Sequence, residues 1–108
     1  MRPRILLLTT GGTIASLPTE EGLAPGLDGE ELARMLPPGI AEHYEVTVRD
    51  ILHLDSSNIQ PEEWQTIARR VFEARADYDG IVITHGTDTM AYTASMLTFK
   101  LRGSAVPV

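Results

Sequence analysis

The 108-residue sequence contains no cysteine, a single lysine and no long apolar run. Without cysteine the chain can form neither a disulfide framework nor a thiolate metal site, so a cytoplasmic location is expected. No apolar run approaches the length of about 20 residues that a helix needs to cross a bilayer, and no membrane partner is expected. Basic residues are also scarce, because 9 lysines and arginines stand against 15 acidic residues, a formal net charge of −6. This balance argues against nucleic-acid binding, which needs a basic surface to neutralise phosphates.

What the sequence does contain is typical of a soluble globular protein, with 43% hydrophobic and 22% charged residues. The length suffices for one domain with a modest core. The last residues, Ala105–Val108, are apolar and typical of a strand that has just begun. Because domains usually end in exposed loops, we expect residues 1–108 to be the front portion of a longer protein.

Two strand-like stretches each run into a turn that contains glycine followed by threonine. Residues 81–84 are mostly apolar and β-branched, which predicts a buried strand of a parallel sheet, and the polar cluster His85–Thr89 follows directly. A similar apolar run at residues 5–8 leads into Thr10–Thr13, whose two glycines permit positive φ and close approach to a ligand. Since α/β sheets bind ligands at the carboxyl ends of their strands, the two turns predict one site built from two loops.

The rest of the pattern predicts alternating strands and helices. Apolar residues at alternate positions favour strands, and apolar residues three and four apart favour helices. We expect strands at 4–9, 44–51 and 81–84, helices at 29–36, 61–76 and 90–101, an irregular loop at 16–28 and a further strand from 105. Joined by right-handed crossovers, this order gives an α/β fold with a doubly wound, mostly parallel sheet flanked by helices, which is Rossmann-like.

The residues of the two turns suit the chemistry of acyl transfer. A threonine hydroxyl becomes a nucleophile when a base or an electrostatic field activates it. Thr13 and Thr87 each follow a glycine at a strand end, where their oxygens could meet on one carbonyl carbon, and Asp88 can accept a hydrogen bond from a hydroxyl or a substrate ammonium. Backbone N–H groups of the turns could hold an oxyanion, which often lowers a barrier by about 3–4 kcal/mol per donor. The alternative, that the turns merely join strands to helices, stays open.

Other polar residues allow two interpretations each. His85 could act as a general base, but its place at the end of a buried strand favours a structural, hydrogen-bonded histidine. Ser56 and Ser57 could bind a substrate carboxylate or close a turn with Asn58, and the turn is favoured. The apolar stripe of the helix at 61–76 consists of Trp64, Ile67, Ala68, Val71 and Phe72, and Trp64 is expected in the core. No histidine or carboxylate spacing indicates a metal site, and the glycines match neither the dinucleotide fingerprint nor the P-loop.

Taken together, the motifs resemble the bacterial-type L-asparaginase/glutaminase family. Thr10–Ala15 read T-G-G-T-I-A, and His85–Thr89 read H-G-T-D-T about seventy residues later, as in that family. Asp55–Ser57 is similar to the family's middle substrate loop, and residues 79–94 are similar almost throughout. The resemblance covers all 108 residues and implies the amino-terminal part of the asparaginase N-terminal domain, without the rest of that domain or the second small domain.

The resemblance implies hydrolysis of the side-chain amide of L-asparagine to L-aspartate and ammonia, without metal or cofactor. By this analogy Thr13 is the nucleophile that forms a β-acyl-enzyme, and Thr87 is a second catalytic threonine. Asp88 matches the aspartate that contacts the substrate amino group, and Ser56 matches the serine that binds the α-carboxylate. The implied catalytic residues are Thr13, Thr87 and Asp88, and the implied substrate-binding set is Asp55, Ser56, Ser57, Gly86 and Asp88. Members of the family form homodimers or homotetramers.

The sequence departs from the family pattern in two places. Many relatives carry a tyrosine in the loop after the first strand, whereas Leu23 stands in that stretch here and no tyrosine occurs between Thr13 and Tyr44. The family's catalytic lysine lies some seventy residues beyond the second threonine, past Val108. Lys100 is expected to face solvent at the end of its helix and is not a candidate for that role.

Two alternatives to a complete asparaginase remain. The first is a non-catalytic fragment that keeps part of the amino-acid binding site, and the absent lysine favours it. The second is the asparaginase-like subunit of a tRNA-dependent amidotransferase. That subunit has an additional domain ahead of the first strand, for which residues 1–4 leave no room, so it is less favoured. The choice between asparagine and glutamine depends on one methylene, and the sequence does not decide it.

Overall fold

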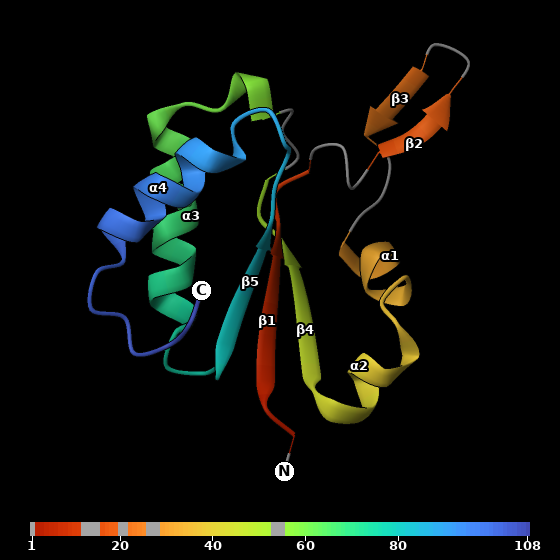
Figure 1. The fold of residues 1–108 in the computed structure, drawn as a ribbon, viewed down its shortest axis with the longest axis vertical. Coiled ribbons are helices and arrows are strands. Elements are labelled where there is room, and N and C mark those ends of the chain that lie inside the picture. Colours follow the sequence, from red (N-terminus) through yellow and green to blue (C-terminus); the bar gives the residue numbers. More distant parts are fainter. Residues whose placement is uncertain (1, 12–15, 20–21, 26–28, 53–55) are drawn as a thin grey trace.

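A three-stranded parallel sheet forms the centre of the protein (Figure 1). The computed structural model describes residues 2–11, 16–19, 22–25, 29–52 and 56–108. The strands are β1 (Arg4–Thr9), β4 (Glu45–Asp50) and β5 (Gly80–Thr84), in the order β4-β1-β5. Thr9 pairs with Asp50 on one side and with Thr84 on the other, so all three strands end at the same edge of the sheet.

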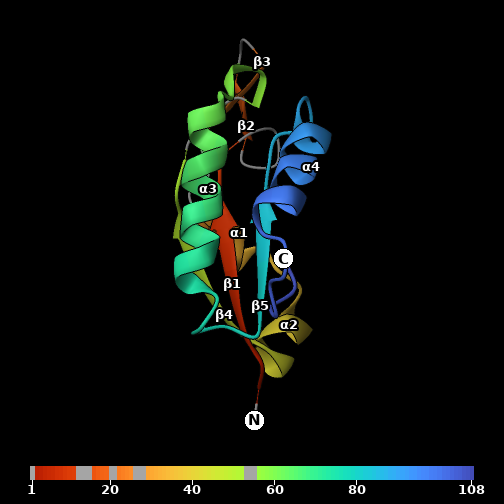
Figure 2. The same ribbon diagram turned by 90° about the vertical axis from the view of Figure 1, so that its left-hand side faces the viewer.

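Helices cover the sheet on both faces, as a doubly wound fold requires. The chain crosses from β1 to β4 through α1 (Gly29–Arg34) and α2 (Pro38–His43), and returns over β1 to β5 through α3 (Pro61–Ala74). Because the two crossovers run in opposite directions and each is right-handed, their helices fall on opposite faces. Figure 2 shows α3 and α2 on opposite sides of the sheet. The last helix, α4 (Met90–Lys100), contacts α3. A parallel sheet with helices on both faces confirms the expected α/β class.

The core lies between β1, β5 and α3. Leu6, Leu8, Val71 and Ile81 form one buried cluster, each with at most 3% of its surface exposed. Side chains alternate across a strand, so Leu6 and Leu8 face the cluster while Leu7 faces the other side of the sheet. The apolar stripe predicted for α3 is correct at Ile67 and Val71.

The same stripe is wrong at Phe72, which the sequence placed in the core. Phe72 is 57% exposed, and its ring lies under the guanidinium of Arg75, 3.5 Å from the ring centroid. One residue after Val71, it is turned about 100° away from the buried face of the helix. Trp64, also expected in the core, is only half-buried, and its indole N–H is hydrogen-bonded.

Two segments differ from the predicted elements. The loop expected at 16–28 contains a hairpin of β2 (Ser16–Thr19) and β3 (Gly22–Pro25), paired antiparallel. Its four-residue strands are too short to give a periodic apolar pattern. The helix expected at 29–36 ends at Arg34, and a second helix that the sequence did not predict, α2, begins at Pro38, where a missing N–H costs nothing.

The remaining differences are small. The predicted strand 44–51 is Glu45–Asp50, and the predicted helix 61–76 ends at Ala74. No strand forms at residues 105–108, where one was expected, although the N–H of Ile81 donates to the carbonyl oxygen of Pro107 at 3.0 Å. Val106 packs against the core cluster, which explains its apolar character. Within the described ranges, no helix has the length and hydropathy needed to cross a bilayer.

Candidate functional site

Three loops leave the sheet at the edge where β1, β4 and β5 end. The first begins at Thr10, the second runs from Ile51 to Asn58, and the third is His85–Thr89. They come from stretches far apart in the sequence, and their first residues lie near one another because the parallel strands end together. In Figure 1 this edge is the upper end of the sheet. Because β1 and β5 are neighbouring parallel strands, the stretches that lead into the two glycine–threonine turns lie side by side.

Hydrogen bonds tie the starts of these loops to one another. The Thr10 hydroxyl donates to the carbonyl oxygen of Thr84 at 2.7 Å, which joins the first turn to the third loop. The N–H groups of Ile51 and Leu52 both donate to the carbonyl oxygen of Thr9, at 3.0 and 3.3 Å. The Thr9 hydroxyl donates to Asp50 Oδ1. Thr9 and Thr10 are buried, so these bonds are shielded from competing water.

The first turn needs its glycine. Gly11 has a φ of 93°, a conformation that residues with a Cβ rarely adopt. Gly11 directly follows Thr10, whose hydroxyl is bonded to the Thr84 carbonyl, so the first turn begins from a fixed point. Thr13, the predicted nucleophile, lies outside the described residues, as does Asp55 of the predicted substrate loop.

The third loop presents two of the predicted site residues to solvent. Gly86 is buried, whereas Thr87 and Asp88 are exposed and directly precede the amino terminus of α4. The free N–H groups of a helix start carry partial positive charge, which favours a carboxylate in that position. An exposed hydroxyl and carboxylate beside these donors suit the binding of a polar substrate.

The middle loop ends in a short 3-10 helix, Ser56–Asn58, as the turn interpretation of these residues predicts. Ser57 is exposed there, so it is also accessible to a ligand. Immediately afterwards α3 begins with a capping box, in which the Gln60 N–H donates to Glu63 Oε2 at 2.8 Å. This cap fixes where the loop enters α3.

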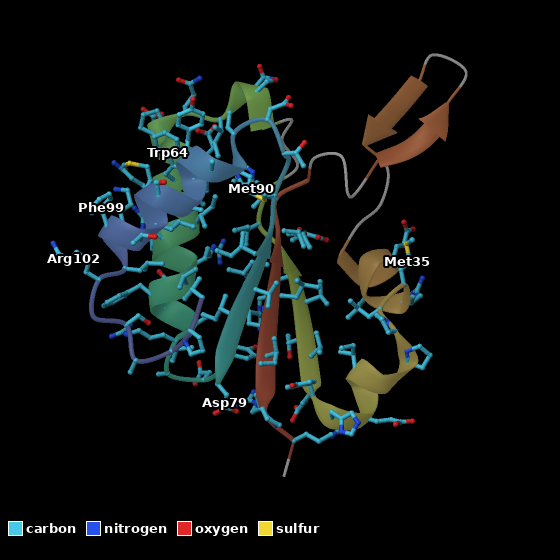
Figure 3. All side chains as sticks on the ribbon, viewed as in Figure 1. Met35, Trp64, Asp79, Met90, Phe99 and Arg102 are labelled. Atoms are coloured by element: carbon cyan, nitrogen blue, oxygen red, sulfur yellow. The ribbon has the colours of Figure 1, made fainter. Side chains whose placement is uncertain are left out.

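His85 is the buried, hydrogen-bonded residue that the sequence favoured. Its Nδ1 lies 2.6 Å from the carbonyl oxygen of Gly86, and its Nε2 lies 2.9 Å from the Thr93 hydroxyl. The indole N–H of Trp64 donates to that same hydroxyl at 2.7 Å. Figure 3 shows Trp64 where α3 and α4 lie together. Sequence reasoning missed this link, because nothing in the spacing of Trp64 and Thr93 indicates a contact between two helices.

A mainly apolar cavity of about 570 Å³ lies beside α4. Its lining includes the apolar residues Ile83, Met90, Leu97, Leu101 and Val106 and the polar residues His85, Thr93, Thr98, Arg102 and Ser104. Neither Thr87 nor Asp88 lines it. Among the described side chains, no three histidines or carboxylates gather as metal ligands would.

Comparison with known proteins gives one consistent result. Residues 4–108 match the family described as "Asparaginase, N-terminal". The L-asparaginase of Thermococcus kodakarensis is 50% identical over 105 residues, which cover 97% of this chain and 32% of that protein. A glutamyl-tRNA(Gln) amidotransferase subunit of Methanopyrus kandleri is 40% identical over 110 residues, which cover 98% of this chain and 24% of that protein.

A solved structure extends the likeness to the fold. The thermostable L-asparaginase from Thermococcus kodakarensis superposes on 89% of this chain with a TM-score of 0.76 and 54% sequence identity, and the match covers 29% of that chain. The present chain therefore spans about a third of the length of the asparaginases it matches.

Proposed function

The chain belongs to the asparaginase family, and from that premise we propose that it is the part of an L-asparaginase that carries the threonine nucleophile. The reaction is hydrolysis of the side-chain amide of L-asparagine to L-aspartate and ammonia. The same family membership favours a homodimer or homotetramer as the working form, located in the cytoplasm, with no cofactor.

In the proposed reaction, the Thr13 oxygen attacks the amide carbon of the asparagine side chain. The carbon–nitrogen bond breaks, the nitrogen leaves as ammonia with the proton of the hydroxyl, and a β-aspartyl ester remains on Thr13. Water then hydrolyses the ester, which releases aspartate and restores the hydroxyl. Thr87 orients the substrate or the attacking water, and N–H donors of the turns hold the oxyanion.

The proposed binding residues divide the substrate between two loops. Asp88 accepts hydrogen bonds from the substrate ammonium, and Ser56 donates to its α-carboxylate. Asp55, Ser57 and Gly86 complete the substrate-binding set. An amino acid held at both charged ends places its side-chain amide at a fixed position, which is how binding energy is converted into orientation.

One observation carries this proposal. The hydroxyl of Thr10, at the start of the first motif, donates to the carbonyl oxygen of Thr84, immediately before the second motif. Two stretches separated by more than seventy residues are thereby held together at the sheet edge where Thr87 and Asp88 are exposed. A site built from two loops requires that the starts of both loops be held together, and this bond supports that arrangement.

An amidotransferase subunit is the second candidate function. The 40% identity to the Methanopyrus kandleri protein over nearly the whole chain favours it, although the Thermococcus kodakarensis asparaginase is more similar at 50%. In that role the same loops would release ammonia for a partner subunit that amidates a tRNA-bound glutamate.

Ammonia release from L-asparagine and L-glutamine, measured in parallel with the protein at its full expressed length, separates the candidates. The proposal expects kcat/KM for asparagine to exceed that for glutamine by about tenfold or more, since one methylene in a fitted pocket is worth about 1–3 kcal/mol. Lys100→Ala is the control, because Lys100 is exposed at the last residue of α4 and should change neither rate. Release from glutamine with none from asparagine would overturn the proposal in favour of the amidotransferase.

A further inference from the structure

Four groups from three parts of the chain form a single row of hydrogen bonds behind the third loop. They are the Trp64 indole, the Thr93 hydroxyl, the His85 imidazole and the Gly86 carbonyl. An indole N–H can only donate and a carbonyl oxygen can only accept, so both ends impose the same direction. Trp64 donates to Thr93, Thr93 donates to His85 Nε2, and His85 Nδ1–H donates to Gly86. In a neutral imidazole this direction places the ring proton of His85 on Nδ1 and leaves Nε2 as the acceptor.

This row sets the direction of one peptide bond in the candidate site. The carbonyl of Gly86 and the N–H of Thr87 belong to the same planar trans peptide, in which they point in opposite directions. Because the Gly86 carbonyl is turned toward the buried His85 ring, the Thr87 N–H is turned away from it. Rotation of this peptide would move both Thr87 and Asp88, the exposed residues that follow.

The row also connects two of the three loops. Trp64 lies in the first turn of α3, where its N–H is bonded to the Gln60 carbonyl, six residues after the end of the middle loop. Thr93 lies in the first turn of α4, where its N–H is bonded to the Thr89 carbonyl at the end of the third loop. The hydrogen bond between Trp64 and Thr93 therefore holds the end of the middle loop in place relative to the end of the third loop.

We propose that Trp64 and Thr93 are positioning residues, which act through His85 to orient the Gly86–Thr87 peptide and so place Thr87 and Asp88 for hydrolysis. The inference rests on the proposed function for its effect on catalysis, but the orientation itself does not depend on it. Thr93 is only 3% exposed and His85 9%, so removal of the Thr93 hydroxyl leaves a buried ring nitrogen without its protein partner.

Substitutions at Thr93 test the proposal in the protein at its full expressed length. Thr93→Val removes the hydroxyl with little change of shape, and Thr93→Ser keeps it. The matched control is Thr98→Val on the same helix, where the residue is exposed and its hydroxyl donates to the Ala94 carbonyl. Thr93→Val should lower kcat/KM for L-asparagine about tenfold, with a fall in kcat and a rise in KM, because the turn carries both a catalytic and a binding residue. Thr93→Ser and Thr98→Val should stay within about twofold of the parent protein.

If Thr93 only stabilised the fold, its loss would change kcat and KM in a different way. Loss of folded protein lowers the apparent kcat but leaves KM unchanged, so an unchanged KM in Thr93→Val would overturn the proposal. An equal loss in Thr93→Val and Thr93→Ser, or in Thr93→Val and Thr98→Val, would overturn it as well.

Selective ¹⁵N labelling of histidine separates this inference from the proposed function. The nitrogen resonances of His85 should report a protonated Nδ1 and an unprotonated Nε2, and the Nε2 signal should shift in Thr93→Val but not in Thr98→Val. A protonated Nε2 in the neutral ring would contradict the assigned direction of the hydrogen bonds, whether or not the protein hydrolyses asparagine. If the parent protein shows this tautomer and no turnover, the proposed function fails while the orientation of the turn stands.

Discussion

At the scale of single residues, burial separates threonines that the sequence presents as equals. Thr9, Thr10 and Thr93 are each at most 4% exposed, and their hydroxyls are used within the protein. Thr87 is exposed at the mouth of the third loop. A buried, bonded hydroxyl holds structure, whereas an exposed one beside a helix start is free to meet a substrate. The sequence predicted Thr87 as a site residue but gave no indication that Thr10 and Thr93 support it.

The first prediction at this scale concerns Asp88, which is exposed immediately before the α4 amino terminus. Asp88→Ala removes the carboxylate proposed to bind the substrate ammonium. A hydrogen bond to a charged group is worth about 1.5–3 kcal/mol, so kcat/KM for L-asparagine should fall by about 10- to 100-fold with a higher KM. Asp77→Ala, which removes an exposed acid before the opposite end of β5, is the control. An unchanged KM in Asp88→Ala would remove Asp88 from the ammonium site.

At the scale of secondary structure, the pattern of apolar residues predicts the elements that are buried in the core. It does not predict two short strands that pair only with each other. The three parallel strands and helices α3 and α4 follow from runs of apolar residues that the core requires. The β2–β3 hairpin was missed, because its two short strands bond to each other and need no apolar face to specify them. Phe72 was misplaced because an aromatic ring can cover an arginine at the surface as well as fill a core.

The core itself yields the prediction for this scale. Leu6, in the central strand, is 1% exposed and packs in the cluster with Val71 and Ile81. Leu6→Ala should lower the free energy of unfolding by about 2–5 kcal/mol, through lost burial and the cavity left behind. Urea denaturation followed by circular dichroism measures the change. Phe72→Ala, at a side chain that is 57% exposed, should lower the free energy of unfolding clearly less. An equal decrease in both variants would contradict the assignment of Phe72 to the surface of α3.

At the scale of the whole molecule, topology brings the candidate site together. Parallel strands ending at one edge place three loops side by side, and the sequence allowed this prediction once the order of strands and helices was recognised. The hydrogen bonds that lock the loops together, from Thr10 to Thr84 and from Trp64 through Thr93 to His85, were not predictable. They join residues 74 and 29 positions apart at single atoms, for which a periodic pattern carries no signal.

The chain covers about a third of the length of its asparaginase relatives, and the reaction proposed for it belongs to the complete protein. Thr87 and Asp88 lie in the third loop, and Thr13, the proposed nucleophile, belongs to the motif Thr10–Ala15 and lies outside the described residues. The central claim is that this first motif provides the nucleophile for the site that the second motif completes.

Ammonia release from L-asparagine by the full expressed protein and by its Thr13→Ala variant tests that claim most directly. The account predicts steady release by the parent protein and none by Thr13→Ala, which should still bind L-asparagine measurably because Asp88 and Ser56 are intact. Thr10→Ser, which keeps the hydroxyl bonded to the Thr84 carbonyl, is the control and should remain active. Turnover retained in Thr13→Ala, or absent from the parent protein, would contradict the account.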